Sequence, residues 1–421
     1  MTTTLPTIEI LCSPSQLRGK VTVPGSKSIT NRALLVAALA NGKSSLSGVL
    51  VSDDTCYMVK ALTELGARIR FSSGTNIEIN GTGTLKQPSD SLYLGNAGTA
   101  MRFLTAACAL VEGNVVLNGD EHMQKRPIHP LIDALNAAGI NATVPSSGCP
   151  PCTLHGQGFI PGGTIGVSGA LSSQFLSSLM LVAPLAKRPT IIKLAEDNIG
   201  ATGYIEVTRS VMEAFGAHVY QDDEKSFHIA NTGYSVCDFK VAPDASAATY
   251  FWAAEKLTGG MIDLGYTSDD FSQPDAAAYT LMQSFPSLPT FIDGAQMQDA
   301  IPTLAVLAAF GSSIVRFTGI ANLRVKECDR IAALHKGLNC IKPGLATIEE
   351  DDLIVFGDPE LPKRARPCTI DSMSDHRITM SFALAGLKCR GIKILEPDCV
   401  GKTFPDYWSE LSSLGVSLSY A

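Results

Sequence analysis

Two turns near the start of the chain combine glycine, hydroxyl and cationic side chains in a pattern suited to binding phosphate. The first is Pro24–Ser28, PGSKS, with Arg32 shortly after it, and the second is Gly95–Thr99, GNAGT, with Arg102 after it. Glycine lets the backbone approach an anion closely, while hydroxyl groups and cations supply hydrogen bonds and charge. Each turn precedes an apolar helical segment, whose first N–H groups are available to an anion. Each also fits an ordinary capped turn when it is considered alone.

Four later turns add carboxylates, amides and more cations at the starts of apolar helices. They are Ser172-Ser173-Gln174, the turn at Asp299, the charged run Asn322–Arg330 (NLRVKECDR) and Asp375-His376-Arg377. Serine and aspartate at these points also fit plain helix caps, and a charge run also fits a solvated face. Within the run, helical spacing would place Lys326 and Arg330 together, with Glu327 on a neighbouring edge. His376 suits either general acid–base chemistry or a structural hydrogen bond.

All six turns are expected to occupy equivalent places in an internal repeat. A helix cap or a solvated face at each single turn would not explain this recurrence. Each copy has a strand, a sharp turn and a helix rich in small apolar residues. The copies begin at Val21, Leu92, Ile165, Phe239, Ile292 and Ile370. A helix that is apolar on every side is expected to be buried.

A second, two-faced helix follows in most copies, with a glycine at its end and a short alternating strand after it. These segments are Tyr57–Arg70, Leu131–Val144, Val207–Tyr220 and Tyr407–Tyr420, with Leu334–Ile348 as a degraded copy. The pattern predicts an α/β fold of βαβαββ units, six times over. Three units in each of two domains would surround buried parallel helices, whose N-termini would line a cleft. We expect the boundary between the domains where the third unit ends, near Asp238–Pro243. By its pattern alone, the first strand, Ile8–Leu11, suits either one.

The composition supports two domains and a small anionic ligand. The chain has 421 residues, 45% of them hydrophobic, and a formal net charge of -7. This charge argues against a nucleic-acid or membrane-surface binder, whereas the cations gather at the turns. Eleven cysteines without framework spacing, and no signal-peptide pattern at the start, predict reduced thiols and a cytoplasmic protein. Cys149-Pro-Pro-Cys152 with His155 fits a metal or redox site, but a single CxxC more often consists of free thiols.

Seven segments, in this order, resemble one family. They are PGSKSITNRAL, GNAGTAMR, KRPI, SSQFL, NLRVKECDRI, DHR and KTFPDY, between Val21 and Trp408. On these residues the chain is identified as a member of the 5-enolpyruvylshikimate-3-phosphate synthases, also named 3-phosphoshikimate 1-carboxyvinyltransferases. The resemblance implies two inverted ring-like domains with the active site in the interdomain cleft. It also implies that the extreme N-terminal segment belongs to the second domain, so that residues 23–240 form the first domain and residues 1–22 plus 241–421 the second.

The resemblance implies transfer of the enolpyruvyl group of phosphoenolpyruvate to the 5-hydroxyl of shikimate 3-phosphate, with release of phosphate, in the shikimate pathway to chorismate and aromatic amino acids. It implies no metal, no organic cofactor, and a monomer that binds neither nucleic acid nor membrane. The residues implied for shikimate 3-phosphate are Lys27, Ser28, Arg32, Ser172, Ser173, Gln174, Tyr204, Asp299, Asn322 and Lys326. Those implied for phosphoenolpyruvate are Lys27, Asn96, Gly98, Arg126, Gln174, Arg330, His376, Arg377 and Lys402. The catalytic residues implied are Asp299, Glu327 and Lys27.

The implied mechanism is addition followed by elimination, with Asp299 similar to the family's base and Glu327 to a proton donor. Two positions depart from the family pattern. Ala201 stands where the family often has serine, and Phe103 stands where proline is common. Gly98 matches the glyphosate-sensitive pattern, whereas Phe103 leaves the degree of sensitivity open.

Two other functions compete with this one. The UDP-N-acetylglucosamine enolpyruvyl transferases share the fold and the donor, but the NLRVKECDR and GNAGTAMR segments resemble the shikimate branch. A non-catalytic binder of phosphate or RNA ends is disfavoured by the negative net charge and by the Asp299 and Glu327 pair. Phosphate release with each acceptor separates the three possibilities.

Overall fold

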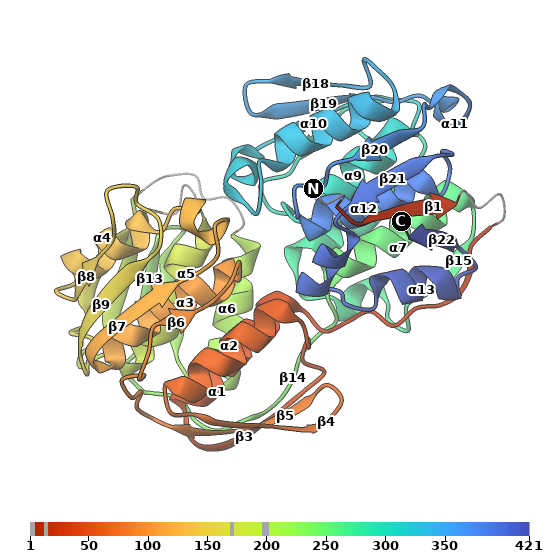
Figure 1. Ribbon diagram of the computed structural model, residues 1–421. Coiled ribbons are helices and arrows are strands. Elements are labelled where there is room, and N and C mark those ends of the chain that lie inside the picture. The colour runs from red at the N-terminus through yellow and green to blue at the C-terminus, as the bar shows by residue number, and fades with distance from the viewer. Residues whose placement is uncertain (1–4, 12–15, 169–171, 196–201, 421) are drawn as a thin grey trace. The chain divides into compact units, whose positions relative to one another are not determined.

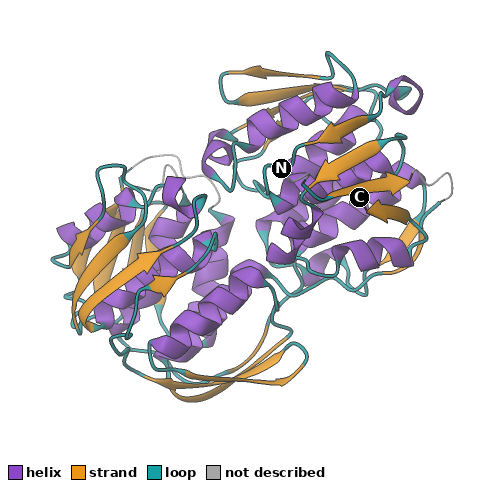
Figure 2. Cartoon of the chain, in the orientation of Figure 1, coloured by secondary structure: helices purple, strands orange, loops and turns teal. Residues whose placement is uncertain are grey.

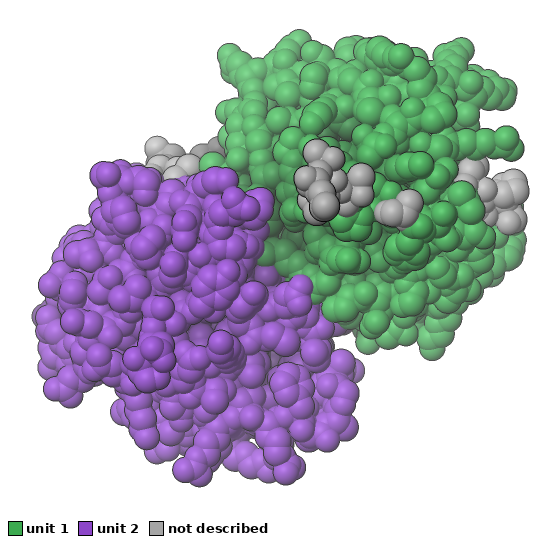
Figure 3. Space-filling model, in the orientation of Figure 1, with its two compact units in different colours: residues 1–24, 244–421 green, residues 25–243 purple. Residues whose placement is uncertain are grey.

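The computed structural model describes residues 5–11, 16–168, 172–195 and 202–420. The chain divides into two compact units, coloured separately in Figure 3. Unit 2 is Gly25–Pro243, and unit 1 combines Met1–Pro24 with Asp244–Ala421. The chain therefore changes unit after Pro24 and after Pro243, a few residues beyond the positions expected from the sequence.

Unit 2 contains three four-stranded sheets with the same strand arrangement (Figures 1 and 2). In each sheet the first two strands are parallel and the other pairs are antiparallel. One sheet consists of β14 (Asp238–Lys240), β3 (Asn41–Ser47), β5 (Asn76–Thr82) and β4 (Arg68–Ser73). The second consists of β6 (Leu92–Tyr93), β7 (Glu112–Asn118), β9 (Cys152–Gln157) and β8 (Asn141–Thr143). The third consists of β10 (Gly163–Val167), β11 (Thr190–Leu194), β13 (Ser226–Ile229) and β12 (Val219–Asp223).

Three helices of unit 2 are buried on nearly every side, and three others have one exposed face. The buried helices are α1 (Lys27–Leu39), α3 (Gly98–Ala107) and α5 (Ser173–Val182). Every residue of α3 is buried, and Ser28 and Gln174 are the exceptions in α1 and α5. Small side chains allow such helices to pack closely on all sides. The two-faced helices are α2 (Asp53–Glu64), α4 (His129–Ala137) and α6 (Gly203–Ala214).

Unit 1 repeats this plan with modifications. One sheet consists of β16 (Phe291–Asp293), β17 (Ile314–Thr318), β19 (Asp352–Phe356) and β18 (Ala346–Glu349). A second consists of β20 (Cys368–Ile370), β21 (Ile392–Leu395), β1 (Thr7–Leu11) and β22 (Ser417–Tyr420), and a third pairs β15 (Met261–Asp263) with β2 (Arg18–Lys20). The buried helices are α7 (Ala245–Thr258), α9 (Ile301–Ala309) and α12 (His376–Gly386). The remaining helices are α8 (Ala277–Met282), α10 (Arg330–Ile341), α11 (Leu361–Arg364) and α13 (Tyr407–Ser413).

The βαβαββ repeat is confirmed, and three details differ from the sequence pattern. The strand predicted at Phe239 pairs with β3 in unit 2, whereas the strand before α1 is β2 and pairs with β15 in unit 1. The first and fourth copies thus exchange their opening strands. The fourth copy is also shorter, because residues 264–290 contain 3₁₀ turns and α8 but no strand pair. In the sixth copy, β1 supplies the strand between β21 and β22.

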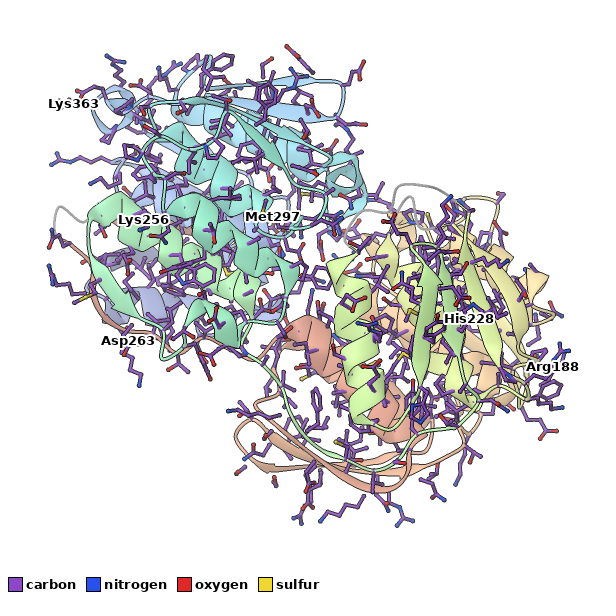
Figure 4. All side chains as sticks on the ribbon, turned by 180° about the vertical axis from the view of Figure 1, so that it is seen from behind. Arg188, His228, Lys256, Asp263, Met297 and Lys363 are labelled. Carbon is purple, nitrogen blue, oxygen red and sulfur yellow. The ribbon has the colours of Figure 1, made fainter. Side chains whose placement is uncertain are left out.

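Some charged side chains outside the six turns lie on the surfaces of the two units. Arg188, just before β11, and Lys363, in α11, both project from the surface of their units (Figure 4). The cysteines of the described residues are free thiols, including Cys149 and Cys152. Their sulfurs have different partners, the Ser147 carbonyl oxygen at 3.5 Å and the Thr105 hydroxyl at 3.6 Å. Among the helices in these ranges, none has the length and apolar character needed to cross a membrane.

Candidate active site

Lys27 opens helix α1 of unit 2, and an acid from the next helix holds its ammonium group. Ser26 is the N-cap, and its Oγ accepts a hydrogen bond from the Ile29 N–H at 3.3 Å. The Lys27 Nζ lies 3.3 Å from the Oδ2 of Asp54 in the first turn of α2, and both side chains are largely buried. Charges buried in this way require a partner. Asp54 was not among the predicted site residues, although two aspartates at a helix start were a signal for it.

The guanidinium of Arg32, also in α1, is almost completely buried and is oriented by neutral oxygens. Its Nε donates to the Thr208 hydroxyl at 2.8 Å, and its Nη1 donates to the Ser28 carbonyl at 2.9 Å. Its Nη2 donates to the Tyr204 carbonyl at 3.3 Å. The Phe103 ring covers the guanidinium, with 5.0 Å between the ring centroid and the guanidinium carbon. Burial lowers the pKa of Arg32 to about 10, so the group stays charged at neutral pH.

Gly98, the first residue of α3, lies against two guanidinium groups. A side chain here would place its Cβ 2.6 Å from the Arg126 Nη2 and 2.7 Å from the Arg102 Nη1. The Arg126 Nη1 donates to the Asn96 side-chain oxygen at 2.9 Å, and the Arg102 Nη1 donates to the Gly98 carbonyl at 3.0 Å. The absence of a side chain therefore lets both cations lie at the start of α3. Arg102 belongs to this group, although it was predicted only as one of the clustered cations.

Helix α5 begins next to α3 and is joined to it by a side-chain hydrogen bond. The Gln174 Nε2 donates to the Thr99 hydroxyl at 3.3 Å. Ser172 caps α5, and its Oγ accepts from the Gln174 N–H at 3.2 Å, so this serine does serve as the cap considered above. Ser173 is buried directly after it. Ala201, one of the two departures from the family pattern, lies outside the described residues.

In unit 1, a buried guanidinium gathers three carboxylates around it. Arg330 donates from Nη1 to Asp299 at 3.0 Å, from Nη2 to Glu327 at 2.7 Å and from Nε to Asp375 at 2.8 Å. Burial would lower the pKa of Arg330, but Asp375, Glu327 and Asp299 together raise it above its ordinary value. Asp375 was not a predicted site residue, although the charged triplet that it begins at a helix start was noted.

Two further cations complete this network. The Arg377 Nη2 lies 2.7 Å from the Asp299 Oδ2, and the Lys402 Nζ lies 3.8 Å from the Glu327 Oε1. Asp299 thus bridges Arg330 and Arg377, and Glu327 bridges Arg330 and Lys402. Each predicted catalytic carboxylate of unit 1 is held between two cations, which favours its ionised form.

The structure corrects three expectations about local geometry. The run Asn322–Arg330 precedes α10, the second helix of the fifth copy, so it is not equivalent in the repeat to the other five turns. Helix α9 begins at Ile301 with Ala300 as its N-cap, so Asp299 is not the cap, and its carboxylate binds guanidinium groups instead. Helix α10 begins only at Arg330, with Asp329 as its cap. Lys326 therefore precedes the helix, and helical spacing does not place it beside Arg330. Asn322 lies in the preceding 3₁₀ turn, Ala321–Val325.

His376 opens α12 and is completely buried, with its Nδ1 3.9 Å from the Asp375 Oδ1. Asp375 caps the same helix, and its Oδ1 accepts from the Arg377 N–H at 2.8 Å. A role of His376 in general acid–base chemistry or in a structural hydrogen bond stays a prediction. Over the ranges given above, no group of three or more His, Cys, Asp or Glu side chains has an arrangement that could hold a metal ion.

The family model described as EPSP synthase (3-phosphoshikimate 1-carboxyvinyltransferase) matches residues 11–285 and 289–411. The chain belongs to the EPSP synthase family. It is 58% identical over 401 residues to the 3-phosphoshikimate 1-carboxyvinyltransferase of Rhizobium leguminosarum bv. trifolii, covering 95% of each chain. It is 53% identical over 410 residues to that of Pseudomonas savastanoi pv. phaseolicola, covering 97% of this chain and 98% of the relative.

Solved structures agree with this assignment. An EPSP synthase from Acinetobacter baumannii matches with a TM-score of 0.80 and 25% identity, over 99% of this chain and 100% of that one. The enolpyruvyl transferase NikO from Streptomyces tendae, at 16% identity and a TM-score of 0.73, shares the fold. As a member of the EPSP synthase family, the chain is a transferase of the shikimate pathway that acts on phosphoenolpyruvate and shikimate 3-phosphate.

The first prediction concerns Asp375 and the stability of unit 1. Asp375→Asn removes the charge that faces the buried Arg330, and breaking a buried ion pair costs about 3–5 kcal/mol in the free energy of unfolding. Both tryptophans of the chain, Trp252 and Trp408, belong to unit 1, so urea unfolding followed by their fluorescence reports this unit. The control is Asp371→Asn, because Asp371 pairs with Lys336 in an exposed position. An equal decrease in the free energy of unfolding in both variants would show that the Asp375 carboxylate is not needed to stabilise the buried charge of Arg330.

Proposed function

We propose that the residues described in both units act on the same two substrates and transfer the enolpyruvyl group by addition followed by elimination. Unit 2 contributes Lys27, Ser28, Arg32, Asn96, Gly98, Arg126, Ser172, Ser173, Gln174 and Tyr204. Unit 1 contributes Asp299, Asn322, Lys326, Glu327, Arg330, His376, Arg377 and Lys402. Both substrates carry phosphate and carboxylate groups, for which cations at helix N-termini are suited.

Shikimate 3-phosphate is assigned to Arg32, Ser28, Ser172, Ser173 and Tyr204 of unit 2, with Asn322 and Lys326 of unit 1. The positive charge of Arg32 supports this assignment, because its hydrogen-bond partners described above are neutral. Phosphoenolpyruvate is assigned to Asn96, Gly98 and Arg126 of unit 2, and to Arg330, His376, Arg377 and Lys402 of unit 1. Lys27 and Gln174 contact both substrates.

The observation that carries the mechanism is that Asp299 and Glu327 share Arg330 and that each binds a second cation. When the phosphate and carboxylate of phosphoenolpyruvate bind these cations, they compete with the two side-chain carboxylates. Asp299 and Glu327 then become better proton acceptors, because an opposite charge that favoured their ionised form is shared with the ligand.

In the addition step, Asp299 accepts the proton of the 5-hydroxyl, whose oxygen attacks the enol carbon of phosphoenolpyruvate. Glu327, once protonated, donates its proton to the methylene carbon. Lys27 supplies positive charge to the tetrahedral adduct. In the elimination step, Glu327 takes a proton back from the new methyl group, the carbon–carbon double bond forms again, and phosphate departs with the proton that Asp299 accepted. Positioned acid–base groups of this kind contribute about 10²–10⁴-fold in rate.

The proposal includes a monomeric, cytoplasmic enzyme that needs no cofactor. The free thiols of the described residues suit a reducing compartment. The test of the reaction is a phosphate-release assay on the purified chain. Release should require both phosphoenolpyruvate and shikimate 3-phosphate. Release with UDP-N-acetylglucosamine as the acceptor would favour the related transferase, and no release with either acceptor would favour a binding protein.

The second prediction concerns Asp299→Asn, which keeps the side-chain size and removes the base. We expect kcat to fall by about 10²–10⁴-fold while phosphoenolpyruvate still binds, as judged by steady-state rates and calorimetry. Asp293→Asn is the control, because Asp293 is exposed and bonds only to nearby backbone in the contacts described. A kcat within a few-fold of the parent would mean that Asp299 only balances the charge of the two arginines.

The third prediction separates two fully buried phenylalanines that each cover a guanidinium. Phe103 covers Arg32, and Phe175 covers Arg102 with 5.5 Å between the ring centroid and the guanidinium carbon. Phe103→Leu should weaken the binding of shikimate 3-phosphate, and Phe175→Leu that of phosphoenolpyruvate, because Arg102 adjoins Gly98. Loss of a cation–π contact of about 0.5–2 kcal/mol corresponds to roughly 2- to 30-fold in affinity.

Calorimetric titration of each ligand tests this split. The two variants make the same change at equally buried positions, so each is the control for the other. If both variants weakened both ligands equally, the rings would serve only to pack the core.

The fourth prediction concerns Gly98→Ala. The new Cβ would displace the Arg126 guanidinium, so the KM for phosphoenolpyruvate should rise. Glyphosate inhibition should weaken more than substrate binding does, because glyphosate is longer and needs the space above Gly98. Gly166→Ala is the control, since a Cβ there meets no atom within 4 Å. The measurement is inhibition against phosphoenolpyruvate at saturating shikimate 3-phosphate. A parent chain that resists millimolar glyphosate, or an equally inhibited variant, would contradict this prediction.

A further inference from the structure

Two thiols of unit 1 lie close to each other, although they are far apart in the sequence. Cys340 is the second-last residue of α10 and is exposed, and Cys368 is the first residue of β20 and is half-buried. The Cys340 Sγ lies 3.8 Å from the carbonyl oxygen of Thr369, the residue after Cys368.

Cys368 is partly shielded from solvent, whereas Cys340 is exposed to it. Burial, followed by the neighbouring Cys340 thiol, raises the pKa of Cys368 to about 12. Cys389, completely buried just after α12, adds a further thiol nearby that also raises this pKa. An oxidant in solution would therefore reach Cys340 first, and Cys368 would be the thiol that reacts afterwards.

We propose that Cys340 and Cys368 form a redox modification site, in which a hydroperoxide converts the two thiols reversibly into a disulfide. The Cys340 sulfur, as thiolate, attacks the O–O bond and becomes a sulfenic acid, while the second oxygen leaves as water or alcohol. The Cys368 sulfur then attacks the sulfenic sulfur, forming the S–S bond and releasing water. Two thiols lose two electrons and one hydroperoxide gains them. A small dithiol restores the reduced pair by exchange.

The disulfide would join two elements whose other ends belong to the charged network. Helix α10 begins at Arg330, and β20 leads into the turn that contains Asp375, which accepts from Arg330 at 2.8 Å. An exposed ion pair, Lys336 with Asp371 at 3.3 Å, already links the same two segments between these points. A disulfide between Cys340 and Cys368 would be the third link between these segments. It would restrict the unfolded chain, so oxidation should stabilise unit 1 against unfolding by urea.

The test uses the full chain under native conditions, treated with hydrogen peroxide and then with a thiol-blocking reagent. Mass spectrometry should show the loss of two hydrogens and one cross-linked peptide pair containing Cys340 and Cys368. Dithiothreitol should reverse the change. The urea midpoint from tryptophan fluorescence should rise on oxidation and return on reduction.

Cys340→Ser and Cys368→Ser should each abolish the cross-link and the shift of the urea midpoint. The matched control is the double variant Cys149→Ser with Cys152→Ser, which removes the sequence CxxC and should leave both unchanged. Peroxide that converts Cys340 only to sulfinic or sulfonic acid would overturn the proposal. A cross-link that forms only in urea would overturn it as well. Neither result depends on enzyme activity, so the outcome is separate from that of the proposed transfer reaction.

Discussion

The charge of one buried side chain, Arg330, constrains most of the architecture of unit 1. A guanidinium with 1% exposure needs polar partners, and here they are three carboxylates from three places in the chain. Asp299 precedes α9, Glu327 precedes α10, and Asp375 caps α12. These elements must keep their relative positions, because a shift of any of them would leave a charge buried without its partner. The requirement for stability therefore also places the two proposed catalytic acids.

In unit 2, neutral oxygens satisfy the buried guanidinium groups of Arg32 and Arg126. Arg32 is satisfied by hydroxyl and carbonyl oxygens, and Arg126 by the carbonyl and side-chain oxygens of Asn96. These neutral oxygens orient the two guanidinium groups. The partners described for Arg32 are neutral, whereas Arg330 of unit 1 is matched by acids. This difference supports anchoring of the acceptor phosphate by unit 2 and proton transfer by unit 1.

Small residues make both arrangements possible. The buried helices of unit 2 approach one another closely because alanine, serine and glycine occupy much of their surfaces, and Gly98 leaves room for two guanidinium groups at the start of α3. Phe103 lies inside this regular helix and packs on Arg32. Phe103 stands where the family pattern has proline, and its ring connects α3 to Arg32 of α1.

Several features of this protein were determined by the sequence alone, because they depend on local order. Hydrophobic periodicity and the glycine-rich turns predicted the six-fold repeat, the buried and two-faced helices, and the places where cations gather at helix starts. The family motifs identified the proposed site residues within each unit. Asp54 and Asp375 were not predicted as site residues, because an aspartate at the start of a helix is also typical of a helix cap. Only the fold shows that Asp54 pairs with Lys27 and that Asp375 pairs with Arg330.

Tertiary structure alone decided which strands pair. Strands β2 and β14 each precede a buried helix, and their exchange between the first and fourth copies follows from which parallel neighbour each one meets. The same holds for β1, which completes the sixth copy from the other end of the chain. It also holds for Asp299, whose role as an ion-pair partner instead of a cap depends on Arg330 and Arg377 from distant helices. Strand pairing and buried ion pairs join residues far apart in the chain, so no local pattern in the sequence encodes them.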